Sequence, residues 1–191
     1  MRKIDEAKRK LVIQAVFEIT YDEGITNLSI GKIAKRAGVS KATIYVYFEN
    51  KTDMLGKIYL EVKRLTDEGL SAKIDSSLPY KKRVRNGVEH FANRFISYPL
   101  QANFMRAVQA NPSEVEPEIL KSSEKLAQPI MDLFNEGVEK GYWITNDQRI
   151  VISILFSPIA QLIEYYFKKG QSVPEKQLTE MLDILVNSLV E

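Results

Sequence analysis

The chain has 191 residues, a hydrophobic content of 45% and a formal net charge of +2, values typical of a globular protein with a sizeable core, and they exclude a disordered chain. It contains no cysteine, which excludes disulfides, thiolate metal sites and cysteine nucleophiles. No apolar run follows the N-terminus, and the longest uncharged stretch, residues 150–163, is shorter than the about 20 residues of a membrane span, so we expect a soluble, cytoplasmic protein.

Positive charge is concentrated near the N-terminus. Residues 1–48 contain nine Lys or Arg and five Asp or Glu, a net charge of +4, so the remaining 143 residues carry −2. A basic segment attached to a mildly acidic one is typical of a DNA-binding protein with a separate body. A solvated charged face would give the same count and remains an alternative.

The apolar residues recur at i, i+3 and i+4 along nearly the whole chain, and the alternation typical of strands is missing. We therefore predict an all-α fold. The predicted helices cover residues 4–22, 30–37, 41–47, 51–69, 79–97, 100–110, 115–140, 147–169 and 175–190.

Helix boundaries near the N-terminus are predicted from capping residues. Gly24 is placed to end the first helix, and Gly38 interrupts the second. Ser29 and Ser40 are expected to cap the second and third helices, and Asn50 to open a long fourth helix. The third helix is predicted to be very short.

The segment after the fourth helix is the predicted junction between two parts of the chain. Gly, Ser and Asp accumulate over residues 69–77, directly before Pro79. We therefore divide the chain into a head at residues 1–50, a connecting helix and junction at 51–77, and a helical body at 78–191.

Two short helices joined by a Gly-containing turn predict a helix-turn-helix, whose second helix enters the major groove of DNA. Its apolar positions predict a small core: Ile33, Ala34, Ala37, Val39, Ile44 and, as an inward plug, Phe48. The helix predicted over residues 41–47, the second of this motif, then exposes Lys41, Ala42, Thr43, Tyr45 and Tyr47. A tyrosine there can cover a sugar or a thymine methyl while its hydroxyl donates to a phosphate.

Two further residues are expected to bind phosphate. Lys51 lies in the first turn of the fourth helix, where its ammonium and the free amides both favour an anion. The Ser29 hydroxyl can hydrogen-bond both to the backbone of its helix and to a phosphate. Alternatives remain open: half-buried packing for Tyr45 and Tyr47, and capping alone for Ser29.

Residues 12–59 read VIQAVFEITYDEGITNLSIGKIAKRAGVSKATIYVYFENKTDMLGKIY. This segment, about a quarter of the chain, resembles the DNA-binding head of the TetR (tetracycline-repressor-like) family of bacterial regulators. The resemblance implies DNA contacts at Ser29, Lys41, Ala42, Thr43, Tyr45, Tyr47 and Lys51. Two positions depart from the family pattern: Val46 stands where a second tyrosine is frequent, and Tyr47 where histidine is often found.

The resemblance also implies a homodimer formed through the last two helices. The sequence independently favours a partner chain, because residues 150–167 are apolar around much of the helix circumference and the last helix adds leucines at helical spacing. A central core helix in a monomer is the alternative.

A small-molecule inducer pocket in the body is the third implication, with residues 78–191 serving as the ligand-binding and dimerisation domain. Occupancy of this pocket would move the fourth helix. His90 and Arg94 lie one helical turn apart and could orient a polar or anionic ligand. The candidate ligand-binding residues are His90, Arg94, Phe95, Phe104, Met131, Phe134 and Phe156. The alternative for the aromatic residues and Met131 is a place in the core.

We therefore expect a ligand-responsive transcriptional repressor that binds a palindromic double-stranded operator as a homodimer and is released by an inducer. A DNA-binding architectural or protein-partner factor without an inducer is one alternative. A small-molecule enzyme is another, disfavoured by a single histidine, no cysteine and no glycine-rich phosphate loop. We predict no catalytic residue, metal site, cofactor or membrane partner.

Overall fold

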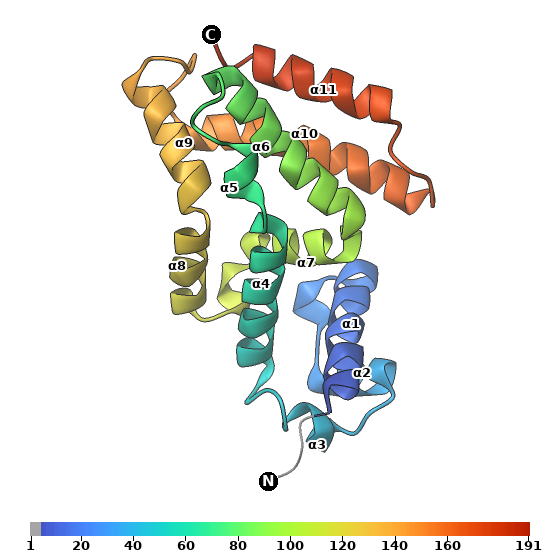
Figure 1. The fold of residues 1–191 in the computed structure, drawn as a ribbon. Helices are drawn as coiled ribbons and strands as arrows, with labels where there is room; N and C mark the ends of the chain where they lie inside the picture. Colours follow the sequence, from blue (N-terminus) through green and yellow to red (C-terminus); the bar gives the residue numbers. More distant parts are fainter. Residues whose placement is uncertain (1–4) are drawn as a thin grey trace. The chain divides into compact units, whose positions relative to one another are not determined.

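The computed structural model describes residues 5–191, and helices dominate it (Figure 1). The predicted all-α class is confirmed. The helices are α1 (Glu6–Glu23), α2 (Ile30–Ala37), α3 (Lys41–Ile44), α4 (Lys51–Asp67), α5 (Leu70–Lys73), α6 (Tyr80–Ser97), α7 (Pro99–Ala110), α8 (Pro117–Leu126), α9 (Gln128–Glu139), α10 (Gln148–Lys168) and α11 (Glu175–Asn187), with 3₁₀ turns at Ile25–Asn27 and Pro112–Glu114.

These helices form two compact units. The first unit comprises the described residues up to Leu65 together with Leu100–Lys125, and the second unit comprises Thr66–Pro99 and Leu126–Glu191. The first unit thus adds most of α4, α7 and α8 to the three helices of the predicted head. The functional boundaries at residues 50 and 77 stay a prediction.

Capping residues set the ends of α1 and α2 as their chemistry requires. The Asp5 carboxylate accepts two amide hydrogen bonds in the first turn of α1, and Gly24 ends that helix with φ of 86°. Ser29 caps α2, and Gly38 ends it in the left-handed region with φ of 66°. The predicted first residue of α1, Ile4, and the basic residues Arg2 and Lys3 lie outside the described residues.

Two predicted helices are wrong in extent. The short helix predicted over residues 41–47 is regular only over Lys41–Ile44, and residues 45–47 continue as a turn. The single helix predicted over residues 115–140 is instead two helices, α8 and α9, separated at Ala127. Pro129 explains this break, because it has no amide to donate to the preceding turn and its ring clashes there.

The core of the first unit lies where α1, α2 and α3 pack against one another (Figure 1). Ile33, Ile44 and Phe48 are buried in it, which confirms the inward prediction for Phe48. Phe17 of α1 meets Phe104 of α7 edge to face, with 5.4 Å between ring centroids. The buried Ile33, Ile44 and Phe48 give the short α3 a rigid base that four helical residues alone would not provide.

The second unit is built around α6, which packs against α9, α10 and α11 (Figure 1). Gly137 of α9 allows a close approach of two aromatic rings to this helix. The Tyr80 hydroxyl donates to the Leu133 carbonyl at 3.0 Å, and Trp143 Nε1 donates to the Phe134 carbonyl at 3.1 Å. A Cβ at Gly137 would lie 2.0 Å from Tyr80 Oη and 2.3 Å from Trp143 Nε1, so this position requires glycine.

Helix α10 is unusually apolar. Among residues 5–191 it alone is long and apolar enough to cross a membrane by length and composition. Only 28% of its most apolar window is buried within the chain. One such helix is weak evidence for a membrane span, since a helix covered by other protein has the same composition.

Candidate nucleic-acid interface

The turn between α2 and α3 is fixed by its own backbone and by a serine. After Gly38, the Val39 amide donates to the Ala34 carbonyl at 3.0 Å. Ser40 Oγ accepts from the Thr43 amide at 3.1 Å and lies 2.9 Å from the Thr43 hydroxyl. The start of α3 is therefore held at one angle to α2.

The apolar side chains of α3 and the following turn decide which face is exposed. Ile44 and Phe48 are fully buried, and Ile33 and Ala34 of α2 are buried beside them. A one-residue rotation of α3 would bring polar side chains into this core and leave them without partners. The packing thus fixes the outward face.

The outward face carries most of the predicted DNA-contact residues. Lys41 and Ala42 are exposed, and Tyr45 has an exposed fraction of 54%. The Tyr45 hydroxyl makes no hydrogen bond to a described residue, so it is available to an outside acceptor. Val46 is also exposed, whereas Thr43 is half-buried. The roles of these residues in DNA binding stay a prediction.

Tyr47 differs from the expectation of an exposed ring. Its side chain is half-buried, and its hydroxyl donates to the Asp5 carbonyl at 2.9 Å. Its ring also meets Phe48 edge to face. The ring is thus only partly exposed, because the chain preceding α1 provides an acceptor for the hydroxyl, which sequence spacing alone does not show; the DNA contact of Tyr47 stays a prediction.

The two predicted phosphate-binding residues outside α3 have different surroundings. Ser29 is exposed, and its Oγ accepts from the Lys32 amide at 3.3 Å, as a capping hydroxyl does. Lys51 Nζ instead lies 2.7 Å from Glu114 Oε2, so its ammonium already has a carboxylate partner. A phosphate at Lys51 would have to replace Glu114.

Acidic residues of α1 neutralise part of the positive charge on α2. Lys32 Nζ lies 2.6 Å from Glu23, and Arg36 Nη1 lies 3.0 Å from Asp22. The hydrogen bond to Asp22 raises the pKa of Arg36 above its ordinary value. Lys32 and Arg36 thus stabilise the packing of α2 on α1. Because their charges are paired, they add little to the uncompensated positive charge of the surface.

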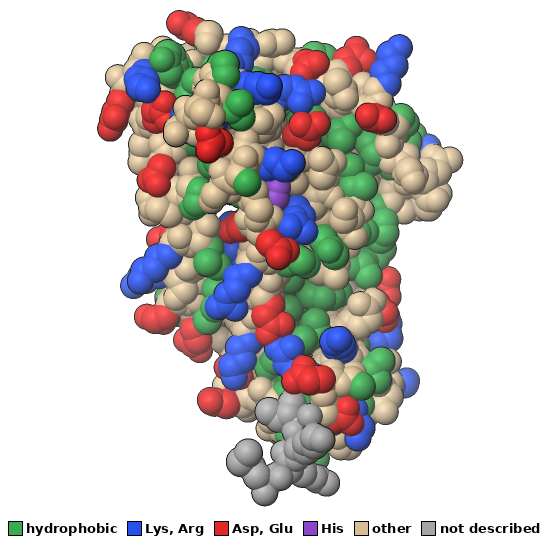
Figure 2. Space-filling view, in the orientation of Figure 1, with side chains coloured by type: hydrophobic (Ala, Val, Ile, Leu, Met, Phe, Trp, Pro, Cys, Tyr) green, Lys and Arg blue, Asp and Glu red, His purple; other side chains and the backbone are tan. Residues whose placement is uncertain are grey.

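Lys35 and Lys41 make no ion pair with any described residue. Both are exposed. Over the described residues in view in Figure 2, Lys and Arg side chains are interspersed with Asp and Glu. The uncompensated charge near α3 is therefore local, and Lys41 places it directly on the outward face.

The predicted ligand residues of the body do not form one group. Phe134 and Phe156 line a cavity in the second unit, with a volume of about 40 Å³. Phe104 belongs to the buried core of the first unit. Phe95 and Met131 are not among the residues that line the cavity, although the Met131 sulfur accepts a hydrogen bond from Gln148 of its wall.

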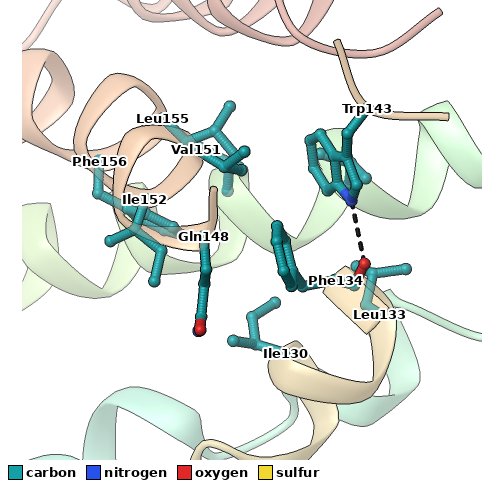
Figure 3. A pocket seen from close by; sticks show the side chains of 11 residues that line it. Ile130, Leu133, Phe134, Trp143, Gln148, Val151, Ile152, Leu155 and Phe156 are labelled. Atoms are coloured by element: carbon teal, nitrogen blue, oxygen red, sulfur yellow. Dashed lines mark hydrogen bonds between the residues drawn. The ribbon is translucent and has the colours of Figure 1, made fainter. Parts of the chain in front are cut away.

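The cavity lies between α6, α9 and α10, and Trp143 closes one side of it (Figure 3). Val84 and Val88 of α6 contribute to the wall together with Gln148 and Leu155 of α10. Sequence reasoning missed Val84, Val88 and Leu155, because Val and Leu at helical spacing have the same pattern in any core, and it missed Gln148 as well.

His90 and Arg94 do not line this cavity. His90 is buried, and its Nε2 lies 2.9 Å from the Thr66 carbonyl oxygen. Burial lowers the pKa of His90, which favours the neutral ring. Arg94 Nη2 donates to the Glu68 carbonyl at 2.7 Å. Both side chains hold the chain at the end of α4.

Two more residues of α6 make the same kind of bond. Arg83 Nε donates to the Ile74 carbonyl at 3.1 Å, and Asn86 Nδ2 donates to the Lys73 carbonyl at 3.0 Å. With His90 and Arg94 they form a polar stripe along α6, which we call the α6 polar stripe. The spacing of three, four and four residues is a signal that the sequence contained.

The family model described as "Bacterial regulatory proteins, tetR family" matches residues 12–58, which include the helix-turn-helix described above. Over this segment the chain has the DNA-binding head of the tetR family. It is a transcriptional regulator with a DNA-binding helix-turn-helix, and not an enzyme.

Similar proteins match the chain over most of its length. The fatty acid metabolism regulator protein of Bacillus subtilis (strain 168) is 23% identical over 93% of this chain and 93% of its own. The crystal structure of a TetR family transcription regulator from Marinobacter aquaeolei VT8 has a TM-score of 0.83 at 20% identity, covering 100% of both chains. A fatty acid degradation regulator from Bacillus halodurans has a TM-score of 0.62 at 20% identity, covering 94% of this chain and 93% of its own.

Proposed function

We propose that this tetR-family regulator is a cytoplasmic, ligand-responsive repressor that binds a palindromic operator as a homodimer and leaves it when an inducer binds. One observation carries the proposal: buried Ile44 and Phe48 hold α3 so that Lys41 and Tyr45 face outward. A short, rigidly supported helix with a free cation and a free hydroxyl suits the major groove and its phosphates.

The contacts within one half-site follow from the surroundings of each side chain. Tyr45 donates its free hydroxyl to a phosphate, and Lys41 supplies charge beside it. Ala42 and the Thr43 methyl offer apolar contact to a thymine. Ser29 and Lys51 bind the phosphates at the edge, the latter by exchanging Glu114 for the DNA. Tyr47 contributes mainly by fixing the chain at Asp5, whose carbonyl accepts a hydrogen bond from the Tyr47 hydroxyl.

Exposed apolar side chains on α10 and α11 support the homodimer. Ile150, Ile152 and Tyr165 of α10 are exposed, and Ile184 of α11 has an exposed fraction of 61%. A second copy related by a two-fold axis would cover the same face on both chains. Two heads then read half-sites about 34 Å apart, which requires a palindromic operator.

The inducer response is proposed to start in the cavity of the second unit. Val84 and Val88 of α6 line it, while His90 and Arg94 of the same helix hold the chain at the end of α4. A ligand that displaces α6 therefore changes the support of α4. It releases the operator only if it binds the released geometry more tightly than the DNA-bound one.

A titration of operator DNA with matched lysine variants tests the proposal. Duplexes from upstream of the protein's own gene and of fatty acid genes are labelled, because the Bacillus subtilis relative is a regulator of fatty acid metabolism. Fluorescence anisotropy at several salt concentrations should show a specific complex whose affinity falls steeply with salt.

Lys41→Ala should weaken this complex about tenfold and flatten its salt dependence, since each phosphate contact contributes about one to the slope. Lys82→Ala is the matched control, because Lys82 is an exposed lysine of α6 outside the helix-turn-helix. Equal losses for the two variants would argue against the assigned face.

A DNA-binding factor without an inducer is the remaining alternative. It predicts that no small molecule releases the operator complex, whereas the proposed repressor loses the complex when its cavity is filled. Expression of a reporter behind the operator distinguishes repression from activation, since deletion of the regulator should raise expression.

A further inference from the structure

The wall of the cavity in the second unit excludes charge. It is formed by aliphatic and aromatic side chains, and Gln148 is the one residue with a polar side-chain amide among the described residues that line it. None of those lining residues is ionisable. An ion enclosed there would lose its hydration without gaining a partner of opposite charge, which costs several kcal/mol.

Two hydrogen-bond donors reach this wall, and they differ in how well they are satisfied. Trp143 Nε1 already donates to the Phe134 carbonyl at 3.1 Å (Figure 3). Gln148 Nε2 donates to the thioether sulfur of Met131 at 2.7 Å. A thioether is a weak acceptor, so an oxygen acceptor of a ligand would replace it with a gain in hydrogen-bond strength.

The shape of the cavity limits what enters without rearrangement. Its volume of about 40 Å³ exceeds the roughly 10–15 Å³ that one enclosed water needs, by a factor of about three. Ile152 on its wall has an exposed fraction of 42%, and Ile130, Phe134 and Phe156 are half-buried. A ligand with a hydrocarbon chain would therefore have to displace these partly exposed side chains.

We propose that the cavity binds an uncharged, apolar molecule with one hydrogen-bond acceptor, and that Gln148 Nε2 donates to that acceptor in place of Met131. An ester, thioester or ketone attached to a hydrocarbon chain has this chemistry, whereas a free carboxylate or an ammonium does not. The proposal rests on the proposed function, because it assigns the ligand class of the same inducer site. It also separates the ligand from His90 and Arg94, whose donors are directed to backbone carbonyls.

Three molecules with the same eight-carbon chain test the charge preference. Methyl octanoate, octanoate and octylamine are titrated at pH 7 against the full-length protein without DNA, in competition with the neutral fluorescent probe N-phenyl-1-naphthylamine. Methyl octanoate should displace the probe at a concentration at least tenfold lower than either ion. Displacement by octanoate or octylamine at an equal or lower concentration would overturn the proposal.

Two variants test the donor. Gln148→Leu keeps the approximate size of the side chain and should weaken methyl octanoate about fivefold to tenfold relative to the probe, whose affinity is measured directly for each variant. Gln148→Glu introduces a carboxylate and should reverse the order, so that octylamine becomes the best competitor. If both variants bind methyl octanoate as the unaltered protein does, Gln148 is not the donor and the proposal fails.

Operator titrations of the unaltered protein separate this inference from the proposed function. If a specific operator complex forms but the three competitors do not follow the expected order, the ligand class is wrong and the regulator assignment stands. If the order is found but no operator complex forms with any fragment, the repressor proposal fails and the chemistry of the cavity stands.

Discussion

Replacing Gly137 with alanine should destabilise the second unit. Replacing a glycine inside a helix with alanine normally stabilises the helix by about 1 kcal/mol, because alanine loses less backbone entropy than glycine. Here the added Cβ would lie 2.0 Å from Tyr80 Oη and 2.3 Å from Trp143 Nε1, far inside normal contact. Both rings must move, and neither is the free end of a flexible side chain.

The magnitude follows from what those rings lose. Overpacking a core typically costs about 1–3 kcal/mol. The hydrogen bonds from Tyr80 to the Leu133 carbonyl and from Trp143 to the Phe134 carbonyl contribute about 1 kcal/mol each. After the gain in helix propensity, we expect the free energy of unfolding to fall by about 2–4 kcal/mol.

Urea denaturation at one fixed protein concentration measures this loss, followed by circular dichroism and by tryptophan fluorescence. Trp143 is the only tryptophan of the chain, so its emission also reports displacement of the cavity wall. Gly31→Ala is the control, because a Cβ there would meet the flexible end of Lys41 at 3.4 Å and Ser29 Oγ at 3.9 Å, with no contact closer than these. An unfolding midpoint and emission maximum for Gly137→Ala equal to those of the unaltered protein would refute the reasoning.

Three further perturbations follow from burial and exposure. Phe48→Ala should lower the free energy of unfolding by about 3–5 kcal/mol and abolish operator binding, since it empties the core under α3; calorimetry and anisotropy measure both. Ile184→Lys should shift the light-scattering mass toward the monomer, and an unchanged dimer mass would place the interface elsewhere. Because the pKa of His90 is lowered by burial, the unfolded chain takes up this proton first, so stability is lost as pH falls below about 6.5. His90→Gln should remove that part of the pH dependence in urea titrations, and proton NMR of this single histidine gives its pKa directly.

The helix-turn-helix was predictable because its signals are local. Ser29 and Ser40 cap the helices that follow them, and Gly38 adopts the left-handed conformation that glycine favours. Each signal lies within a few residues of the backbone group that it satisfies. The burial of Ile44 and Phe48 followed from the same short-range spacing.

The partners of Tyr47 and Lys51 were not predictable in the same way. The Tyr47 hydroxyl donates to Asp5, which is 42 residues away in the chain. The Lys51 ammonium pairs with Glu114, in a 3₁₀ turn that sequence reasoning did not identify. Such pairs depend on how distant helices pack, and single-residue chemistry allows many carboxylates and carbonyls as partners. The break between α8 and α9, in contrast, was recoverable from Pro129.

The α6 polar stripe shows why a lone histidine was misleading. In sequence, polar residues at helical spacing are typical of a solvated face, and His90 with Arg94 also suggested a ligand site. The last carbonyls of any helix lack intrahelical donors and must be satisfied from elsewhere. Helices α4 and α5 end within a few residues of each other, and the α6 polar stripe donates to four carbonyls between Thr66 and Ile74. In this chain the polar residues of α6 are therefore better interpreted as donors that cap the C-terminal ends of α4 and α5.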